Sequence, residues 1–92
     1  MEGRRLRISG RVQGVSFRAS MVNEAHRQGA AGWVRNRHDG SVEALVCGTP
    51  EVIAGMIGWA RRGPPAAEVL QVLVEDEVPP ADIDGFHLAV TA

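Results

Sequence analysis

The chain has 92 residues, of which 45% are hydrophobic and 23% charged, the usage of an ordinary globular domain. Its single cysteine, Cys47, excludes an intrachain disulfide, and its charged first residues exclude the apolar centre of a secretory signal. No apolar run approaches the length of a membrane span, so no membrane partner is expected. From its length and its single cysteine, we expect the chain to form one cytoplasmic domain over residues 1–92, and we expect a monomer.

Charge is unevenly distributed along the chain. Residues 1–37 carry eight arginines and two acids, a net charge of +6, whereas residues 38–92 carry two arginines and nine acids, a net charge of −7. A basic first half favours an anionic partner, either a small phosphate compound or a nucleic acid. Arginines that only solvate one face would give the same count, so charge alone leaves both interpretations open.

The first half of the chain predicts a strand, a helix and a hairpin. Apolar and charged residues alternate over 5–12, which is the period of a half-buried strand. After a loop over 13–16, apolar residues recur at helical spacing from Phe17, and Gly29 is a plausible stop. Two short strands over 33–36 and 42–47 are joined by the turn residues Asp39-Gly40.

The second half predicts one more helix and two strands. Thr49 is placed to cap a helix with Pro50 at its first position, and residues 63–65 (Gly-Pro-Pro) end it. Residues 68–75 alternate as a fourth strand, and residues 86–90 form a short last one. This order predicts an α+β fold, a ferredoxin-like split βαβ sandwich with an antiparallel sheet of four to five strands and two helices on one face. Many unrelated activities use this fold, so function has to come from the site.

The loop before the first helix has the composition of a phosphate cradle. Backbone N–H groups of such a loop, together with the free donors of the helix's first turn, bind anions. Arg18 lies in that first turn, where a cation is unfavourable next to the helix dipole unless an anion joins it. A plain strand–helix turn with a surface arginine would look the same, so the loop by itself does not decide.

A second candidate is Asn36, near the end of the second strand. It shares a strand face with Val34, and an amide there both donates and accepts hydrogen bonds, as the orientation of a water molecule requires. Asparagine is also common just before an Asp-Gly turn, which gives Asn36 an ordinary explanation.

The two segments together resemble the signature stretches of the acylphosphatase family. These are residues 10–18 (GRVQGVSFR), residues 32–36 (GWVRN) and the following residues 39–43 (DGSVE), and the likeness runs from about Arg4 to Val90. The resemblance implies that Arg18 and Asn36 are catalytic, with Arg18 on the phosphate and Asn36 on the attacking water. It also implies that the phosphoryl oxygens are bound by the backbone N–H groups of Gln13, Gly14, Val15, Ser16 and Phe17. Neither a metal nor an organic cofactor is expected. Many relatives carry an aromatic residue after the motif arginine, whereas this chain has Ala19 and Ser20, which leaves substrate preference open.

The residues also agree with acyl phosphates as the substrate class. His26, His38 and His87 lack the spacing of metal ligands, and no covalent nucleophile precedes Arg18 at the distance found in cysteine-dependent phosphatases, where Val12 stands. An acyl phosphate expels a carboxylate whose conjugate acid has a pKa of about 4, so no general acid is needed. We therefore expect hydrolysis to a carboxylate and inorganic phosphate.

Two alternatives stay open at this point. One is a binding module for RNA or an anionic metabolite, although the four aromatic residues form no paired strand motif for base stacking and no nucleic-acid partner is expected. The other is a regulatory domain of a larger enzyme, which the start at Met1 disfavours.

Overall fold

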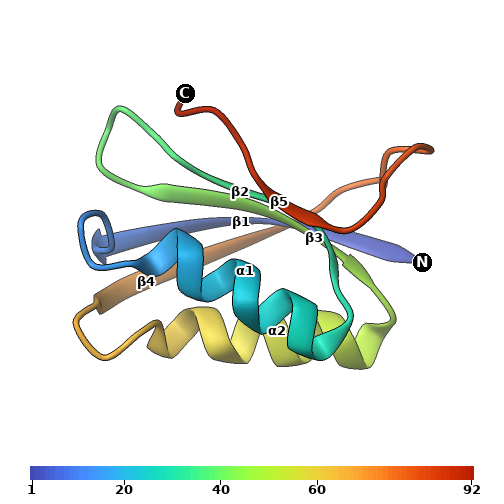
Figure 1. Cartoon of the computed structure of the whole chain (residues 1–92), viewed down its shortest axis with the longest axis horizontal. Coiled ribbons are helices and arrows are strands. Elements are labelled where there is room, and N and C mark those ends of the chain that lie inside the picture. The colour runs from blue at the N-terminus through green and yellow to red at the C-terminus, as the bar shows by residue number, and fades with distance from the viewer.

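The computed structural model describes all 92 residues and places two helices on one face of a five-stranded sheet (Figure 1). The elements are β1 (Glu2–Arg11), α1 (Phe17–Gln28), β2 (Ala31–Asn36), β3 (Val42–Gly48), α2 (Pro50–Arg62), β4 (Glu68–Asp76) and β5 (Phe86–Leu88). The predicted element order and the ferredoxin-like α+β class are confirmed. No helix is both long and apolar enough to cross a membrane.

The sheet differs from the prediction in one respect, because it is mixed rather than purely antiparallel. Its strand order is β4-β1-β3-β2-β5, and three of its four pairs are antiparallel. The strand β5 instead pairs with β2 in parallel, with Gly32 beside Phe86 and Val34 beside Leu88. The strands β4 and β5 lie at opposite edges of the sheet, and the connection between them crosses the sheet at the end where β4 finishes. The chain therefore enters β5 in the direction opposite to β4, which is the direction of β2.

The core lies between the helices and the sheet. The stripe Phe17, Met21 and Ala25 of α1 is buried, and so is the stripe Ile53, Met56 and Ala60 of α2. Both stripes face the inward residues of β1, β2 and β3 in one hydrophobic cluster. Burying a side chain of this size stabilises the fold by roughly 1.5–3 kcal/mol, so these two faces hold the layers together.

The backbone of β2 is fixed by a close approach to its neighbour. Gly32 has φ +140°, and a Cβ there would lie 1.8 Å from the carbonyl oxygen of Leu45 on β3. Only glycine allows this contact. It sets the path of the strand that carries Asn36 to the end of the sheet where the β1–α1 loop, the β2–β3 hairpin and the C-terminus gather (Figure 1).

Candidate active site

The β1–α1 loop is anchored at two points and exposes its backbone between them. Val12 and Val15 are buried with 1% and 8% of their surface exposed, whereas Gly14 and Ser16 face solvent. Gly14 has φ +73°, and Ser16, with φ +64°, is the one non-glycine residue in the left-handed region. Backbone strain of this kind is typical of ligand-binding loops.

The first turn of α1 lacks the usual cap. Ser16 occupies the N-cap position, but its side chain accepts no hydrogen bond from the helix, and the first turn has no acidic residue. In α2, by contrast, the Thr49 hydroxyl accepts from the Val52 N–H at 3.2 Å, and Glu51 lies in the first turn. The free N–H groups and positive dipole of α1 are thus left without an anionic side chain.

Arg18 adds a full positive charge to this helix start. It is half-buried and takes part in none of the ion pairs or side-chain hydrogen bonds of the molecule. A guanidinium next to uncapped helix donors is the arrangement expected where an anion binds.

Asn36 ends β2 with an unsatisfied side-chain acceptor. Its Oδ1 is buried and accepts no hydrogen bond from the protein. Its backbone is held by the C-terminal segment, because the Ala92 N–H donates to the Asn36 carbonyl at 3.0 Å and the His38 N–H donates to the Ala92 carbonyl at 2.8 Å. A buried amide oxygen without a partner is costly unless a ligand or water supplies one.

One cavity of about 160 Å³ joins the two segments. It is lined by both predicted catalytic residues, by most of the predicted loop and by three further apolar residues: Arg18, Asn36, Gln13, Gly14, Ser16, Phe17, Val12, Ala19 and Leu88. Val15 does not line it, because that side chain packs into the core. The fold therefore brings together residues 18 apart in the sequence, across α1.

Comparison with known proteins, by sequence and by structure, gives the family of this chain. The family model Acylphosphatase matches residues 4–88. An acylphosphatase from Azoarcus sp. (strain BH72) is 60% identical over 91 residues, which cover 99% of this chain and 92% of that protein. The chain belongs to the acylphosphatase family. The crystal structure of acylphosphatase from Bacillus subtilis agrees, with a TM-score of 0.91 at 32% identity, covering 97% of this chain and 99% of the other.

Membership of the acylphosphatase family, with relatives at 46–60% identity, supports a hydrolase that acts on acyl phosphates. The acylphosphatase fold also forms a segment of a longer protein. HypF of T. kodakarensis matches 97% of this chain with a TM-score of 0.85 at 27% identity, but the match covers only 12% of HypF.

The Gln13 side chain has a role that the sequence did not indicate. Its amide nitrogen donates to the carbonyl oxygens of Arg37 at 2.8 Å and Ser41 at 2.9 Å. These carbonyls belong to the β2–β3 hairpin that follows Asn36, so Gln13 ties the β1–α1 loop to the strand end that carries the amide. Only its backbone was expected to act, and a glutamine in a loop gives no signal for such a long-range contact.

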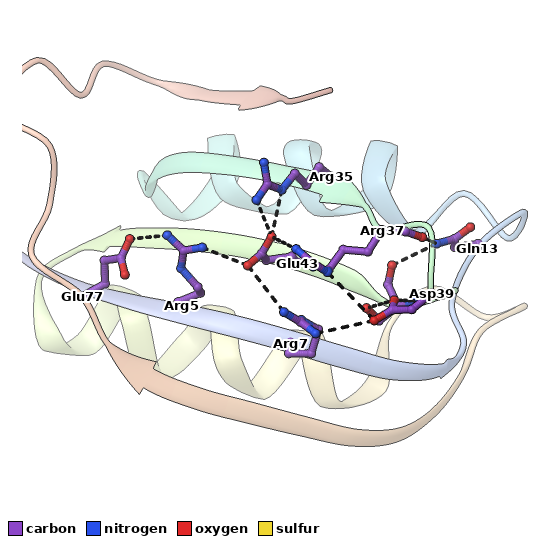
Figure 2. A network of polar contacts seen from close by, with 9 residues as sticks. Arg5, Arg7, Gln13, Arg35, Arg37, Asp39, Glu43 and Glu77 are labelled. Atoms are coloured by element: carbon purple, nitrogen blue, oxygen red, sulfur yellow. Dashed lines mark hydrogen bonds and ion pairs between the residues drawn. The ribbon is translucent and has the colours of Figure 1, made fainter. Parts of the chain in front are cut away.

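Away from Arg18, a group of arginines lies on the sheet face that the helices leave open (Figure 2). Glu43 on β3 has only 3% of its side chain exposed, and four arginines from the neighbouring strands and the hairpin surround it. Its Oε1 accepts from Arg35 Nε at 2.8 Å and Arg37 Nη1 at 3.0 Å, and its Oε2 accepts from Arg5 Nη1 at 2.9 Å. Arg7 Nη2 is farther away, at 3.9 Å.

The charge of Glu43 is kept by these arginines. Burial by itself would raise its pKa, but hydrogen bonds from Arg35, Arg5 and Arg37 outweigh burial and lower the pKa to about 2. On the outer face of β3, Arg7 and Arg35 lie beside the buried Glu43, and Arg5 and Trp33 lie beside the buried Leu45. The arginine group around Glu43 is therefore a packed layer of the fold and does not line the cavity.

The remaining ionisable candidates lie outside the cavity. His38 is exposed and does not contribute to the lining. Cys47 is fully buried, and burial raises the pKa of its thiol, so it packs as a small apolar side chain. No group of three or more His, Cys, Asp or Glu side chains is placed to hold a metal ion.

Proposed function

We propose that this enzyme hydrolyses acyl phosphates by direct attack of water, with the phosphate held by Arg18 and the loop of residues 13–17 and the water held by Asn36. The observation that carries the proposal is the single cavity into which an unpaired guanidinium, an uncapped helix start and an amide with a buried free acceptor all converge. Each of the three groups lacks a partner in the protein, and one bound phosphate with its attacking water supplies all three.

In this mechanism the protein acts by positioning and by charge. Arg18 and the backbone N–H groups bind the phosphoryl oxygens and stabilise their negative charge in the transition state. Asn36 holds the water in line with the bond from phosphorus to the acyl oxygen. The water oxygen bonds to phosphorus, the bond to the acyl oxygen breaks, and its electron pair leaves on the carboxylate.

The proton of the attacking water goes to a phosphoryl oxygen of the substrate itself. This assignment is supported by the lining of the cavity, in which Arg18 is the one ionisable side chain. The pH–rate profile should therefore follow the ionisation of the substrate. A profile that instead follows a histidine, and changes when His38 is replaced by Gln, would contradict it.

Nucleic acid is not proposed as a partner, for reasons found on the open face of the sheet. Trp33, the aromatic residue there, has the guanidinium of Arg35 at 4.7 Å from its ring centre and that of Arg5 at 5.5 Å. Both arginines are bound to Glu43. A ring flanked in this way does not offer a free platform for base stacking. We also propose that the protein is a monomer of one domain and acts in the cytoplasm. Its single cysteine is buried and unpaired, which fits a reducing compartment.

The test is phosphate release from acetyl phosphate in the presence of EDTA. Wild-type turnover should survive the chelator, and Arg18→Ala should lower it by about 10²–10³-fold, the loss found when a donor to a developing anion is removed. Arg61→Ala, which removes an exposed and unpaired arginine of α2, is the matched control and should stay within about twofold. Full activity of Arg18→Ala, or no turnover by the folded wild type, would overturn the proposal.

A further inference from the structure

The cavity has an apolar side that the phosphate chemistry does not use. Four of its lining residues are apolar, namely Val12, Phe17, Ala19 and Leu88. Val12 and Phe17 are 1% and 2% exposed, so their side chains belong to the core. Ala19 and Leu88 are exposed, and Leu88 leaves 57% of its surface open. The apolar surface that a ligand can reach is therefore made mainly by Leu88, with Ala19 beside it.

The position of Leu88 follows from the parallel pairing of β5. The register sets Leu88 beside Val34, two residues before Asn36 on the same face of β2. Phe86 lies on this face too, but it is covered by the core and only 2% exposed. The Ala89 N–H donates to the Val34 carbonyl at 2.8 Å, which fixes the backbone next to Leu88. Leu88 is thus held rigidly at the cavity, whereas other exposed apolar residues such as Leu70 lie away from it.

The charges of the cavity limit what else can bind there. Arg18 is its one cation, and the reacting phosphate occupies it under the proposed function. A carboxylate or a second phosphate on the acyl group would lie against Leu88 and Ala19 without a counter-charge, which is unfavourable. An uncharged hydrocarbon group gains by covering the same surface.

We propose that Leu88 and Ala19 form the subsite for the acyl group, and that the preferred substrates are acyl phosphates with an uncharged, apolar acyl group. This inference rests on the proposed function, because the subsite is defined by a phosphate bound at Arg18.

The test compares acetyl phosphate, 4-methylbenzoyl phosphate and 4-carboxybenzoyl phosphate by kcat/KM. The two benzoyl compounds have nearly equal leaving-group strength and differ in the para substituent, which is an uncharged methyl group in one and a carboxylate in the other. Each methylene-sized group buried is worth about fourfold, and a carboxylate placed there also loses hydration, so wild type should prefer 4-methylbenzoyl over 4-carboxybenzoyl phosphate by about tenfold or more. Leu88→Ser should lower kcat/KM for 4-methylbenzoyl phosphate by about fivefold and lower it less for acetyl phosphate, whose single methyl group covers less of Leu88. Inhibition by inorganic phosphate, which has no acyl group, should be nearly unchanged.

Two further variants make the result specific. Leu88→Lys supplies a cation and should reverse the preference toward 4-carboxybenzoyl phosphate. Leu70→Ser removes a leucine that is 75% exposed on β4 and should leave kcat/KM for all three substrates unchanged relative to one another. Equal loss for all three substrates in Leu88→Ser, or equal rates of wild type on both benzoyl compounds, would overturn the subsite alone. Absence of turnover on every acyl phosphate would instead overturn the proposed function beneath it.

Discussion

Two arginine environments of this chain, the open face of the sheet and the start of α1, differ in what neutralises the positive charge. On the open face of the sheet, Arg5, Arg35 and Arg37 all bind the buried carboxylate of Glu43 (Figure 2). At the start of α1, Arg18 has no carboxylate and lines a cavity. Both groups belong to the same basic first half of the sequence, where a count of charges makes them look alike.

The arginines bound to Glu43 stabilise the fold, whereas Arg18 is available to a ligand in the cavity. Around Glu43 every arginine already has a carboxylate partner inside the protein, which is Glu43 itself or the flanking Asp39 and Glu77. At Arg18 the compensation is left to whatever binds. The side chain of Gln13 connects the two regions, because it reaches from the phosphate loop to the hairpin that also carries Arg37.

Replacing Glu43 gives the largest expected effect and would sharpen this comparison. Glu43→Gln leaves the surrounding guanidiniums without their shared charge, and removal of one partner from a buried ion pair costs about 3 kcal/mol or more. The free energy of unfolding in urea should fall by about this amount, while kcat at a temperature where the variant is folded should stay within about threefold. Glu75→Gln, an exposed acid on β4, should change neither. If Glu43→Gln lost turnover but kept its stability, the two regions would not be separate.

The lowered pKa of Glu43 also predicts how the free energy of unfolding depends on pH. The pKa of Glu43 is about 2 in the folded protein, below its ordinary value of 4.5. As the pH falls, the unfolded chain takes up the proton first, so the stabilisation is complete above about 4.5 and is lost between 4.5 and 2. The gap in unfolding free energy between wild type and Glu43→Gln should be constant near neutral pH and should narrow over that acidic range. A gap that widens there would contradict the ion-pair account.

Replacing Gln13 gives a smaller effect and tests the connection between the regions. Gln13→Met keeps the volume but removes both hydrogen bonds to the hairpin, so the loop and Asn36 lose their fixed separation. We expect kcat to fall by about tenfold, equivalent to about 1.4 kcal/mol, with a smaller change in the affinity for inorganic phosphate. The hairpin carbonyls keep their partners at the Gly40 and Arg37 N–H groups, so stability should fall by only about 1 kcal/mol. Gln71→Met on β4 is the control, and equal kinetic effects of the two variants would contradict a positioning role.

Local signals in the sequence were enough for most of the fold. Alternation located β1 and β4, the Asp39-Gly40 turn located the hairpin, and Thr49 was correctly expected to cap α2. The pairing of β5 was missed, because three residues of strand carry no information on direction. The parallel arrangement follows from where the chain crosses the sheet, which is a property of the whole topology.

The candidate site was predictable only in part. Arg18 and Asn36 were proposed from their motifs, and both line one cavity, whereas their catalytic roles stay a prediction. The Gln13 side chain contacts residues 24 and 28 positions away, and Glu43 binds arginines 6, 8 and 38 positions away. No local pattern encodes these contacts, because they form only when the strands pair. Glu43 in particular alternates in its strand like an ordinary exposed acid, and its burial arises only when arginines of two other strands cover it.

The most direct test of the central claim separates binding of the phosphate from positioning of the water. We would measure kcat on acetyl phosphate and the affinity for inorganic phosphate by calorimetry, for wild type, Asn36→Ala and Arg18→Ala, with Asn23→Ala on the exposed side of α1 as the control. The account predicts that Asn36→Ala loses about 100-fold or more in kcat yet binds phosphate within about threefold of wild type, whereas Arg18→Ala loses both. Wild-type turnover by Asn36→Ala, or a loss of phosphate affinity equal to that of Arg18→Ala, would contradict the division of roles between the two residues.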